Sequence, residues 1–522
     1  MLSFTEFWII IACYLVFILG IGAFVRVKAM IKARKGIETG NLFASRLSWG
    51  QCLMTYLASL MSVWFFFSGP GGYFKGGIVY FMSEVTWLPM FMITAHFVND
   101  RVWAISRRRK YSTPTDFLCD RFSGKTARLI RFLVGLIFLA SAFPYVTSVM
   151  AAIAGGATRI SDGSMNYNLV ILIMGFAMVI FTMIGGFKSV ALTDTIQGIV
   201  FMVAIWVIAI AILAAGYGGN LIECVKSVSA VDNGAFFSYP GPRNWVPYSY
   251  RFGYPFALMI GFSVMLPHVF VRCTISGRDL KTQRRLATWA PWMRLIVLTG
   301  SCMLGFLAFG LMPDMATEDA EYLIPFLIEK ILNPTNPILA HILMVVFFCG
   351  ACAVGISTAD SYLLSAASVI TDDILKGTFG LKMSEKTSNT IGRIVILLVG
   401  GVGVIWAINP PALIADLIMF SVAITMPLFP IMVIGMYWKK ATTTAALVSV
   451  IGGEVGVGLT YLVFNNGSIW YGALGTLIAA VLMIVVSLLT QEKTNEEFFT
   501  DLNESWQEIY QVDEKHAKEL AQ

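Results

Sequence analysis

Charged residues are scarce in this sequence. Only 13% of its 522 residues are Asp, Glu, Lys or Arg, whereas 57% are hydrophobic, and the mean hydropathy is +0.74. A water-soluble globular domain carries about twice that charged fraction. The composition therefore excludes a soluble protein and indicates a chain whose apolar surface faces lipid. The net charge of +6 is small and gives no reason to expect a nucleic-acid partner.

Histidine and ordered cysteine patterns are also lacking. The four histidines are far apart in the sequence, at positions His96, His268, His341 and His516. Without a histidine cluster, or a nucleophile beside a base, the chain is not expected to be an enzyme. The eight cysteines lie in apolar segments without the spacing of a disulfide framework or a zinc site. The pair Cys349 and Cys352 falls inside a hydrophobic run, where both are expected to be small core residues.

Long apolar runs, by contrast, fill the chain. Thirteen segments are long enough to cross about 30 Å of hydrocarbon. They cover residues 5–25, 48–72, 77–98, 127–155, 167–186, 190–216, 253–271, 287–312, 338–371, 389–408, 411–437, 441–464 and 469–490. The first lacks the basic start and cleavage site of a signal peptide, so we expect it to be retained as a helix. The predicted fold class is an all-α polytopic membrane protein.

Basic residues fall in alternate loops. They cluster at 26–35, 107–110, 278–285, 376–382 and 439–440. Lys and Arg favour the cytoplasmic side, so this alternation predicts an N-terminus outside, a C-terminus in the cytoplasm and an odd number of spans in the plasma membrane. The loop from Met312 to Tyr322 agrees, because it is acidic and carries no base.

Two segments lie outside the apolar runs. The predicted outer loop at 217–251 is rich in aromatics and prolines, which suits either a packed cap or interfacial anchors of helix ends. The tail at 491–522 is acidic, with apolar residues at helical spacing, and we expect it to lie along the cytoplasmic face. The predicted organisation is one transmembrane domain at 1–490 followed by this amphipathic tail.

The second span is interrupted. Its sequence ALASLMSVWFFFSGPGGYFKGG places Ser59 and Ser62 at mid-depth and crowds glycines and a proline at its end. Unpaired backbone carbonyls are tolerated in a membrane only where they line a cavity or bind an ion. An ordinary glycine-containing helix end is the alternative.

The ninth span favours the ion-binding interpretation. Ser357, Ser361, Ser365 and Ser368 recur every three or four residues, so they share one helix face. Hydroxyls can bond to their own helix. Asp360 beside them cannot, and a buried carboxylate needs a cation, a proton or a basic partner.

A third polar element is GGFKSVALTDTIQG, residues 185–198. Its tight glycine turn leads into a helix that carries Asp194. This acid could line an ion path, or it could be favoured by the positive end of the helix dipole.

These elements together resemble the sodium:solute symporter family, which contains transporters of proline, pantothenate, monocarboxylates and glucose. The resemblance rests on GGFKSVALTDTIQG, on ISTADSYLLSAASVITDDILK, on GPGGYFKGG and on YWKKATTTAALVSVIGG, which occur in the family's order over residues 5–490. It implies sodium-coupled uptake of a small organic solute, with sodium, solute and lipid as the partners. It also implies a leucine-transporter-like core of two inverted five-helix repeats at 48–437, an extra helix at 5–25 and peripheral helices at 441–490.

The resemblance further implies the ion ligands. Sodium would be held by the backbone carbonyls of Ala58, Met61 and Val354 and by the hydroxyls of Ser357 and Thr358. A second ion site or ion path would include Asp194, Asp360 and Ser361. The chain departs from the family in having Leu60 where many members carry an acid, and in having Met426 and Leu428 where a glycine pair is usual.

The solute is expected to contact the interrupted second span, the kinked fourth and the seventh. The candidates are Ser59, Ser62, Trp64, Tyr145 beside Pro144, Tyr254, Phe256 and Ser263. Glu84, Asp416, Glu454 and His268 could line the path or bond between helices. Half-helix N-termini favour anionic groups, and GPGGYFKGG resembles the pantothenate and monocarboxylate branches. A small organic carboxylate or an amino acid such as proline is therefore expected.

Three other functions compete with this interpretation. A proton-coupled carrier would use Asp194 and Asp360 as titrating groups. A transporter-like sensor would need a separate signalling partner. A channel is disfavoured, because broken helices and buried carboxylates suit occlusion better than an open pore.

Overall fold

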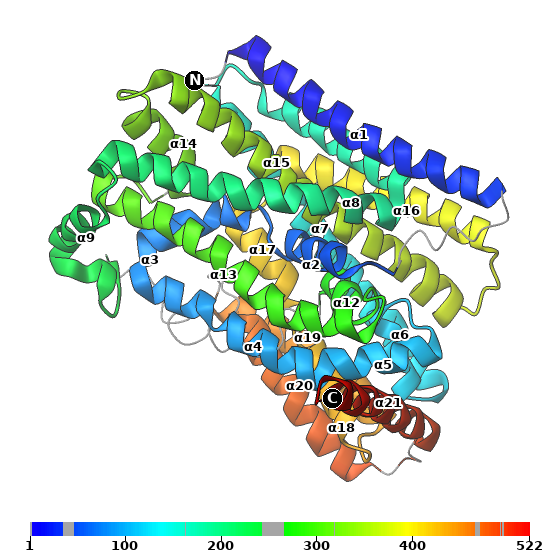
Figure 1. The fold of residues 1–522 in the computed structure, drawn as a ribbon. Coiled ribbons are helices and arrows are strands. Elements are labelled where there is room, and N and C mark those ends of the chain that lie inside the picture. The colour runs from blue at the N-terminus through cyan, green and yellow to red at the C-terminus, as the bar shows by residue number, and fades with distance from the viewer. Residues whose placement is uncertain are drawn as a thin grey trace.

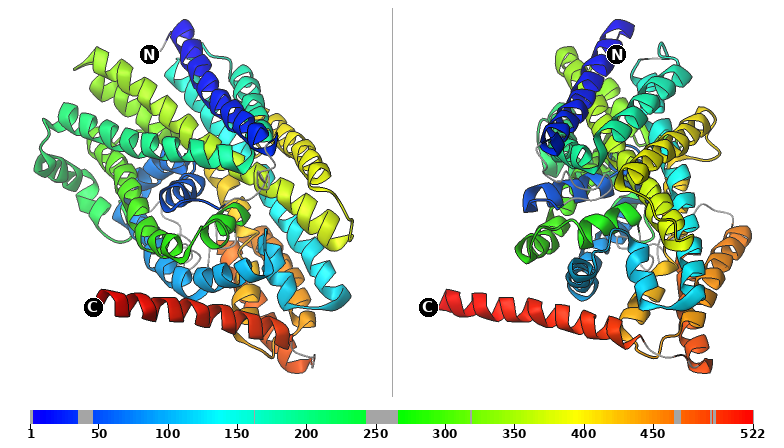
Figure 2. Two further views of the ribbon diagram at one scale, coloured as in Figure 1. Left: turned by 45° about the vertical axis from the view of Figure 1, so that its right-hand side comes forward. Right: turned by 90° about the vertical axis from the view of Figure 1, so that its right-hand side faces the viewer.

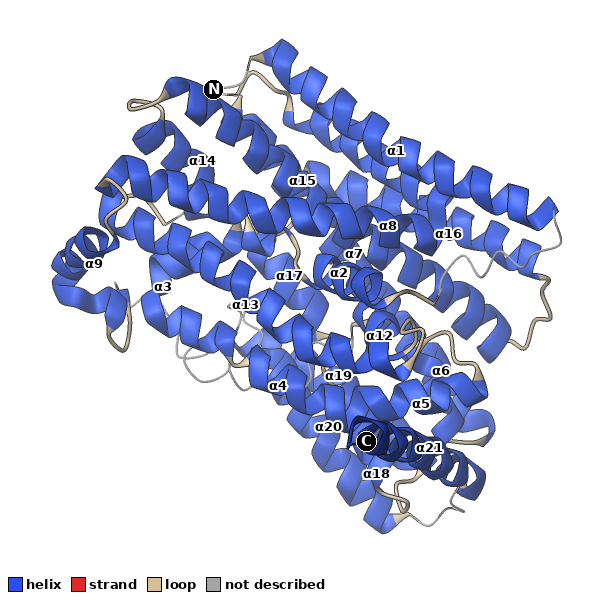
Figure 3. Ribbon diagram, viewed as in Figure 1, coloured by secondary structure: helices blue, strands red, loops and turns tan. Residues whose placement is uncertain are grey.

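The computed structural model describes residues 3–34, 46–161, 163–242, 266–317, 319–464, 470–490, 492 and 495–521. Over these residues the chain is a bundle of helices (Figure 1). The described part contains no strand, and its only extended pairing is an isolated bridge between Leu47 and Gly277 (Figure 3).

Long helices form the body of the bundle. They are α1 (Phe4–Arg34), α7 (Gly124–Ile160), α8 (Tyr167–Tyr217), α13 (Leu280–Leu311), α15 (Pro337–Ser368), which the π-helical segment η8 (Val369–Thr378) extends, and α16 (Glu385–Ile408). The other helices are α2 (Trp49–Leu60), α3 (Ser68–Val85), α4 (Trp87–Thr94), α5 (Asp100–Arg109), α6 (Pro114–Arg121), α9 (Leu221–Ala230), α12 (Pro267–Thr274), α14 (Leu323–Leu327), α17 (Ile414–Ala423), α18 (Leu428–Tyr437), α19 (Thr443–Phe464), α20 (Trp470–Leu489) and α21 (Glu496–Ala521).

Local capping fixes where several of the long helices begin. Asn166 accepts a hydrogen bond from the backbone N–H of Leu169 at 3.1 Å, and Asp279 accepts one from Thr282 at 2.8 Å. Asn336 caps α15 in the same way and is followed by Pro337 at the first helical position. Such caps satisfy N–H groups that a helix leaves unpaired, which matters most where water is scarce.

Ten helices among the described residues are long and apolar enough to cross a membrane. The thirteen segments expected from the sequence differ from these for local reasons. Gly186 takes φ 62° and ψ −172°, so α8 contains two of the expected spans joined by a bend. The second expected span is broken, which leaves α2 with only 12 residues. Most of 253–271 lies outside the described residues.

The break in the second span lies near the middle of the bundle (Figure 1). Helix α2 ends at Leu60, because Met61 adopts an extended conformation with ψ 97°. A short 3-10 turn, η1 (Val63–Phe65), follows, and its first N–H groups are capped by Ser62, whose hydroxyl accepts from Trp64 N–H at 3.1 Å. Helix α3 then begins at Ser68. The chain therefore crosses the bundle here as two short helices joined by irregular backbone.

Helices α8, α13 and α15 surround this break. Helix α2 packs against all three, and α15 also packs along α7 and α8. Helix α1 lies along α8 at one edge of the bundle, while α19 and α20 pair with each other at another (Figure 1). This arrangement leaves the irregular backbone buried in protein and not exposed to lipid, as an interrupted span requires.

Both segments outside the apolar runs pack on the bundle. Within 217–242, Phe236 is buried. Its ring lies 5.4 Å from that of Phe306 and 5.1 Å from that of Phe309 on α13, which is the kind of contact that a packed cap makes. The remainder of that loop is outside the described residues. Helix α21 crosses one end of the bundle, with the N-terminus at the opposite end (Figure 2). Its Phe498 and Leu502 are buried, and it packs against α5.

Candidate functional site

Five oxygen atoms converge where the broken helix meets α15. The hydroxyl of Ser357 donates to the carbonyl oxygen of Ala58 at 2.8 Å. The hydroxyl oxygen of Thr358 lies 3.1 Å from the same carbonyl, 3.0 Å from that of Val354 and 3.5 Å from that of Met61. Both hydroxyl-bearing residues and Ala58 are fully buried. The structure thus brings together all five groups expected to hold sodium.

This cluster has more lone pairs than hydrogens. The single hydroxyl hydrogen of Thr358 can serve only one of its three neighbouring carbonyls at a time. Hard cations of sodium's size are bound by oxygens at about 2.3–2.6 Å, which puts neighbouring ligands about 3.4 Å apart. The observed separations of 2.8–3.5 Å are close to that spacing. Rotating the two hydroxyls and moving the oxygens by a few tenths of an ångström would create a small cation site.

Two buried carboxylates lie beside the oxygen cluster. Asp194 on α8 accepts a hydrogen bond from Thr55 of α2 and lies 3.5 Å from the guanidinium of Arg272. Asp360 on α15 accepts a hydrogen bond from Thr182 of α8 and has no ion pair within the part of the chain that the structure describes. The two acids expected to form a second ion site therefore differ, because only Asp194 has a fixed cation.

Ser361 connects these groups. Its hydroxyl lies 2.9 Å from that of Ser59, receives a hydrogen bond from Arg272 at 2.7 Å and donates to the carbonyl of Ser357 at 2.8 Å. Arg272 also donates to Thr55 at 2.9 Å. A continuous polar network thus runs from the Asp194 pair to the oxygen cluster through α2, α12 and α15.

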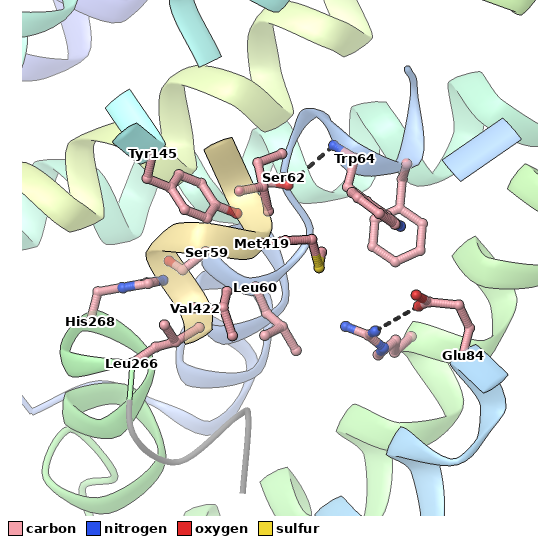
Figure 4. A pocket seen from close by; sticks show the side chains of 13 residues that line it. Ser59, Leu60, Ser62, Trp64, Glu84, Tyr145, Leu266, His268, Met419 and Val422 are labelled. Atoms are coloured by element: carbon pink, nitrogen blue, oxygen red, sulfur yellow. Dashed lines mark hydrogen bonds and ion pairs between the residues drawn. The ribbon is translucent and has the colours of Figure 1, made fainter. Parts of the chain in front are cut away.

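A small cavity of about 30 Å³ lies on the other side of Ser59 (Figure 4). Four of the expected solute contacts line it, and Glu84 and His268 line it too. The full lining is Ser59, Leu60, Ser62, Trp64, Phe65, Glu84, Tyr145, Leu266, His268, Arg294, Ile418, Met419 and Val422. A volume of this order holds about two water molecules. The cavity lies next to the oxygen cluster, but in this arrangement of helices it is smaller than an organic solute.

Other expected contacts lie elsewhere. Tyr254, Phe256 and Ser263 fall outside the described residues. Pro144 and Asp416 line a separate, mostly apolar cavity between α7, α16 and α17. Glu454 lies on α19 and lines neither cavity. Tyr145 stays at the solute cavity because its ring stacks on that of Tyr362 at 4.2 Å.

The sequence interpretation missed two arginines. Arg272 belongs to the acid network, and Arg294, near the middle of α13, forms an ion pair with Glu84 at 3.2 Å and lines the cavity. Each lies in or next to an apolar run, where a charged side chain is costly unless it is paired. An arginine in such a run was the signal that could have identified both residues.

Irregular backbone at mid-bundle, a cluster of hard oxygens and an adjacent cavity within an all-helical membrane protein define a secondary active transporter. The sequence profile of the sodium:solute symporter family matches residues 42–453. The chain belongs to this family. It is a multi-pass membrane carrier that couples solute uptake to sodium, and it is not an enzyme.

Individual relatives extend over nearly the whole chain. The sodium/pantothenate symporter of Haemophilus influenzae is 25% identical over 489 residues, which are 92% of this chain and 95% of the relative. The osmoregulated proline transporter of Bacillus subtilis is 26% identical over 456 residues, 84% of this chain and 87% of the relative.

Solved structures identify the fold. A Na+-coupled sialic acid symporter in an outward-open, substrate-bound state superimposes with a TM-score of 0.72 over 94% of this chain and 99% of that one, at 16% identity. A nucleobase-cation-symport-1 family transporter gives 0.55 over 89% of this chain and 98% of that one, also at 16% identity. The chain thus has the leucine-transporter-like fold expected from its sequence.

Proposed function

We propose that the protein takes up a small organic carboxylate or an amino acid, such as pantothenate, a monocarboxylate or proline, together with sodium. The names of its relatives, a sodium/pantothenate symporter and a proline transporter, support this range of solutes. The observation that carries the proposal is the pair of hydrogen bonds from Ser357 and Thr358 to the carbonyl of Ala58, one residue from the cavity-lining Ser59. Ion and solute would thus act on the same broken helix.

In this proposal sodium is held by the carbonyls of Ala58, Met61 and Val354 and by the hydroxyls of Ser357 and Thr358. The ligands come from α2 and α15, which are separate helices, so a bound cation would hold them together. That is how an ion can favour one arrangement of the bundle over another.

Asp194, Asp360 and Ser361 form the proposed second ion site or ion path. Their burial and the hydrogen bonds that link Ser361 to both Ser59 and Ser357 support such a role. Arg272 already pairs with Asp194, which leaves Asp360 as the carboxylate with capacity for a further cation.

The solute is proposed to occupy this cavity after the helices around it move apart, as alternating access requires. Ser59, Ser62, Trp64 and Tyr145 supply hydroxyl, indole and phenol groups there. Tyr254, Phe256 and Ser263, which are outside the described residues, remain proposed contacts from the seventh span.

The proposed organisation is a transporter domain at 1–490 and a tail at 491–522, in the plasma membrane, with the N-terminus outside and the C-terminus in the cytoplasm. The opposite positions of the N-terminus and α21 support this orientation (Figure 2). Ion pairs of α21 with the basic residues Arg108 and Arg109 also support it, because basic residues favour the cytoplasmic side.

The proposed cycle is alternating access. Sodium binding from outside stabilises the arrangement in which α2 and α15 are joined, and this raises the affinity for solute in the adjacent cavity. Release inside follows from the low internal sodium and the membrane potential, which contributes about 2.3 kcal/mol per charge per 100 mV.

Uptake into proteoliposomes tests the proposal. Labelled pantothenate, propionate, proline and glucose would be offered with a sodium gradient or a pH gradient imposed separately. We expect a carboxylate or an amino acid to accumulate only with inward sodium, and Ser357→Ala with Thr358→Ala to abolish that dependence. Thr371→Ala is the matched control, because its buried hydroxyl bonds only within its own helix. Accumulation of glucose alone, or sodium dependence that survives the double substitution, would overturn the solute class or the ion site respectively.

Reporter fusions test the orientation. Alkaline phosphatase, which is active only outside the bacterial cytoplasm, and a fluorescent protein, which matures inside, would each be joined after Gln522. We expect fluorescence without phosphatase activity. The reverse pattern would place the C-terminus outside.

A further inference from the structure

Glu84 lies at one end of the solute cavity (Figure 4), where it forms a buried ion pair with Arg294. The side chains of Arg294 and Glu84 are 6% and 1% exposed, and the Nη2 atom of Arg294 lies 3.2 Å from the Oε2 atom of Glu84. They come from α13 and α3, which pack against each other. They are the only oppositely charged side chains among the described residues that line this cavity.

The guanidinium is held in a fixed orientation by aromatic rings. Its central carbon lies 4.4 Å from the ring centre of Trp87 and 5.5 Å from that of Phe65. Such cation–π contacts favour a guanidinium over an aromatic face. With its faces engaged by rings, Arg294 presents its N–H groups along the edge of the group.

Part of that edge has no partner. The Nε atom of Arg294 is buried and makes no hydrogen bond to any described residue. A guanidinium carries five N–H donors in a planar fork that matches a carboxylate with two parallel hydrogen bonds. A buried donor left without a partner is costly, so a free Nε–H beside a cavity indicates a place for an acceptor.

The opposite end of the cavity is different. Ser59, Tyr145 and His268 lie there, away from Glu84 (Figure 4). These groups carry hydroxyl and imidazole functions, while Leu60, Met419 and Val422 lie between the two ends. Once widened, the cavity would therefore suit a solute with an anionic end, an apolar part and a hydrogen-bonding end.

We propose that Arg294 is the specificity-determining residue of the solute site and that it binds the carboxylate of an organic acid, with Glu84 holding the guanidinium in place. This inference rests on the proposed function and narrows it, because it requires the solute to carry a carboxylate. Glu84 compensates the buried charge of Arg294 when no solute is bound, since an unpaired buried charge would destabilise the bundle.

The same geometry gives a reason for sodium to promote solute binding. A carboxylate brings negative charge into a cavity shielded from water, where electrostatic interactions are stronger than in bulk water. The oxygen cluster is adjacent, since Ala58 precedes the cavity-lining Ser59. A sodium ion there stabilises the incoming anion, and by linkage the anion stabilises the sodium.

The test compares carboxylates with analogues that lack the carboxylate. Thermal unfolding of the purified full-length protein would be followed in sodium with propionate, pantothenate or proline, and with propionamide, panthenol or prolinamide. The main variant combines Arg294→Gln with Glu84→Gln, which removes both charges and so leaves no unpaired charge. Arg294→Lys tests whether charge without the planar fork is sufficient. Arg285→Gln, on the same helix but outside the cavity, is the matched control.

We expect at least one carboxylate to stabilise the unmodified protein, with an apparent affinity at least about tenfold above that of its analogue. This preference should vanish in the double variant, weaken in Arg294→Lys and persist in Arg285→Gln. A preference that survives in the double variant would show that the ion pair is only structural. Equal stabilisation by both members of every pair, or by none of the carboxylates, would also overturn the proposal.

A separate measurement distinguishes this failure from failure of the proposed function. Stabilisation by sodium alone, without solute, reports the oxygen cluster and should be retained in the Arg294→Gln and Glu84→Gln variant. If sodium stabilises the protein but carboxylates have no advantage, only the assignment of Arg294 is wrong. If sodium alone has no effect, the proposed ion site is wrong.

Discussion

Arg272 lies 3.5 Å from Asp194, and both side chains are almost completely buried, at 2% and 0% exposure. The arginine belongs to α12 and the acid to the second half of α8, and both helices pack against α2. Through Thr55 and Ser361 the guanidinium also holds α2 and α15. This one side chain therefore joins the four helices that surround the candidate ion site.

Breaking this pair from one side should be worse than neutralising both partners. Asp194→Asn leaves the buried guanidinium of Arg272 without its counter-ion, and loss of one partner of a buried pair typically costs about 3–5 kcal/mol. We expect the double variant Asp194→Asn with Arg272→Gln to have a higher melting temperature than Asp194→Asn alone, although lower than the unmodified protein. Thermal unfolding of the purified proteins measures these melting temperatures. If the losses from the two substitutions simply added in the double variant, the coupling would be contradicted.

Sodium itself should stabilise the protein through Thr358. A ligand at about 100 times its dissociation constant stabilises the native state by about 2.7 kcal/mol. We expect sodium, but not potassium, to raise the melting temperature, and Thr358→Val to remove this effect because valine has nearly the same shape and no hydroxyl. Thr371→Val is the control, because it makes the same chemical change outside the oxygen cluster. A sodium response that persists in Thr358→Val would exclude this hydroxyl as a ligand.

The sequence could predict the elements of this site, because local chemistry determines them. Hydroxyls at helical spacing identify the polar face of α15, and the crowding of glycine and proline after Ser59 predicts an interrupted span. Both are properties of short segments. Bends are harder to predict from a short segment. In α8, for example, Gly186 joins two expected spans into one long element.

The partners across the bundle could not be predicted in the same way. Ser357 meets Ala58 across 299 residues, and Arg294 meets Glu84 across 210. Such contacts depend on how distant helices pack, which periodicity does not encode. The family resemblance supplied the first contact. Nothing in the sequence interpretation supplied the second, because an isolated arginine in an apolar run has no visible counter-ion until the helices are placed.

Close packing of α13 on α3 should make Gly305 intolerant of any side chain. A Cβ atom there would lie 2.6 Å from the carbonyl oxygen of Pro70 and 2.9 Å from the amide nitrogen of Phe74. Both are backbone atoms of α3, so relief requires a shift of that helix, and overpacking of this kind costs about 1–3 kcal/mol. We expect Gly305→Ala to lower the melting temperature. Gly401→Ala is the control, because nothing lies within 4 Å of its Cβ position, and it should leave stability equal or slightly higher.

The tail helix α21 should depend on Arg109 for its attachment. The Nε atom of Arg109 lies 2.6 Å from Asp501, and its Nη1 atom lies 2.9 Å from Asp120, so this arginine joins the tail to α6. Its side chain is only 16% exposed, which makes the network stronger than an ordinary surface pair, although the apolar residues Phe498 and Leu502 also hold the helix.

Hydrogen exchange of the α21 amides measures this attachment. We expect Arg109→Ala to speed their exchange about tenfold, which corresponds to about 1.4 kcal/mol of lost docking. At about 1 M salt the screening length falls to about 3 Å, so the ion pairs weaken. The α21 amides of the unmodified protein should therefore also exchange faster. Arg128→Ala, at an exposed arginine of α7, should change neither. Unchanged exchange in Arg109→Ala would mean that the apolar face alone keeps the tail on the bundle.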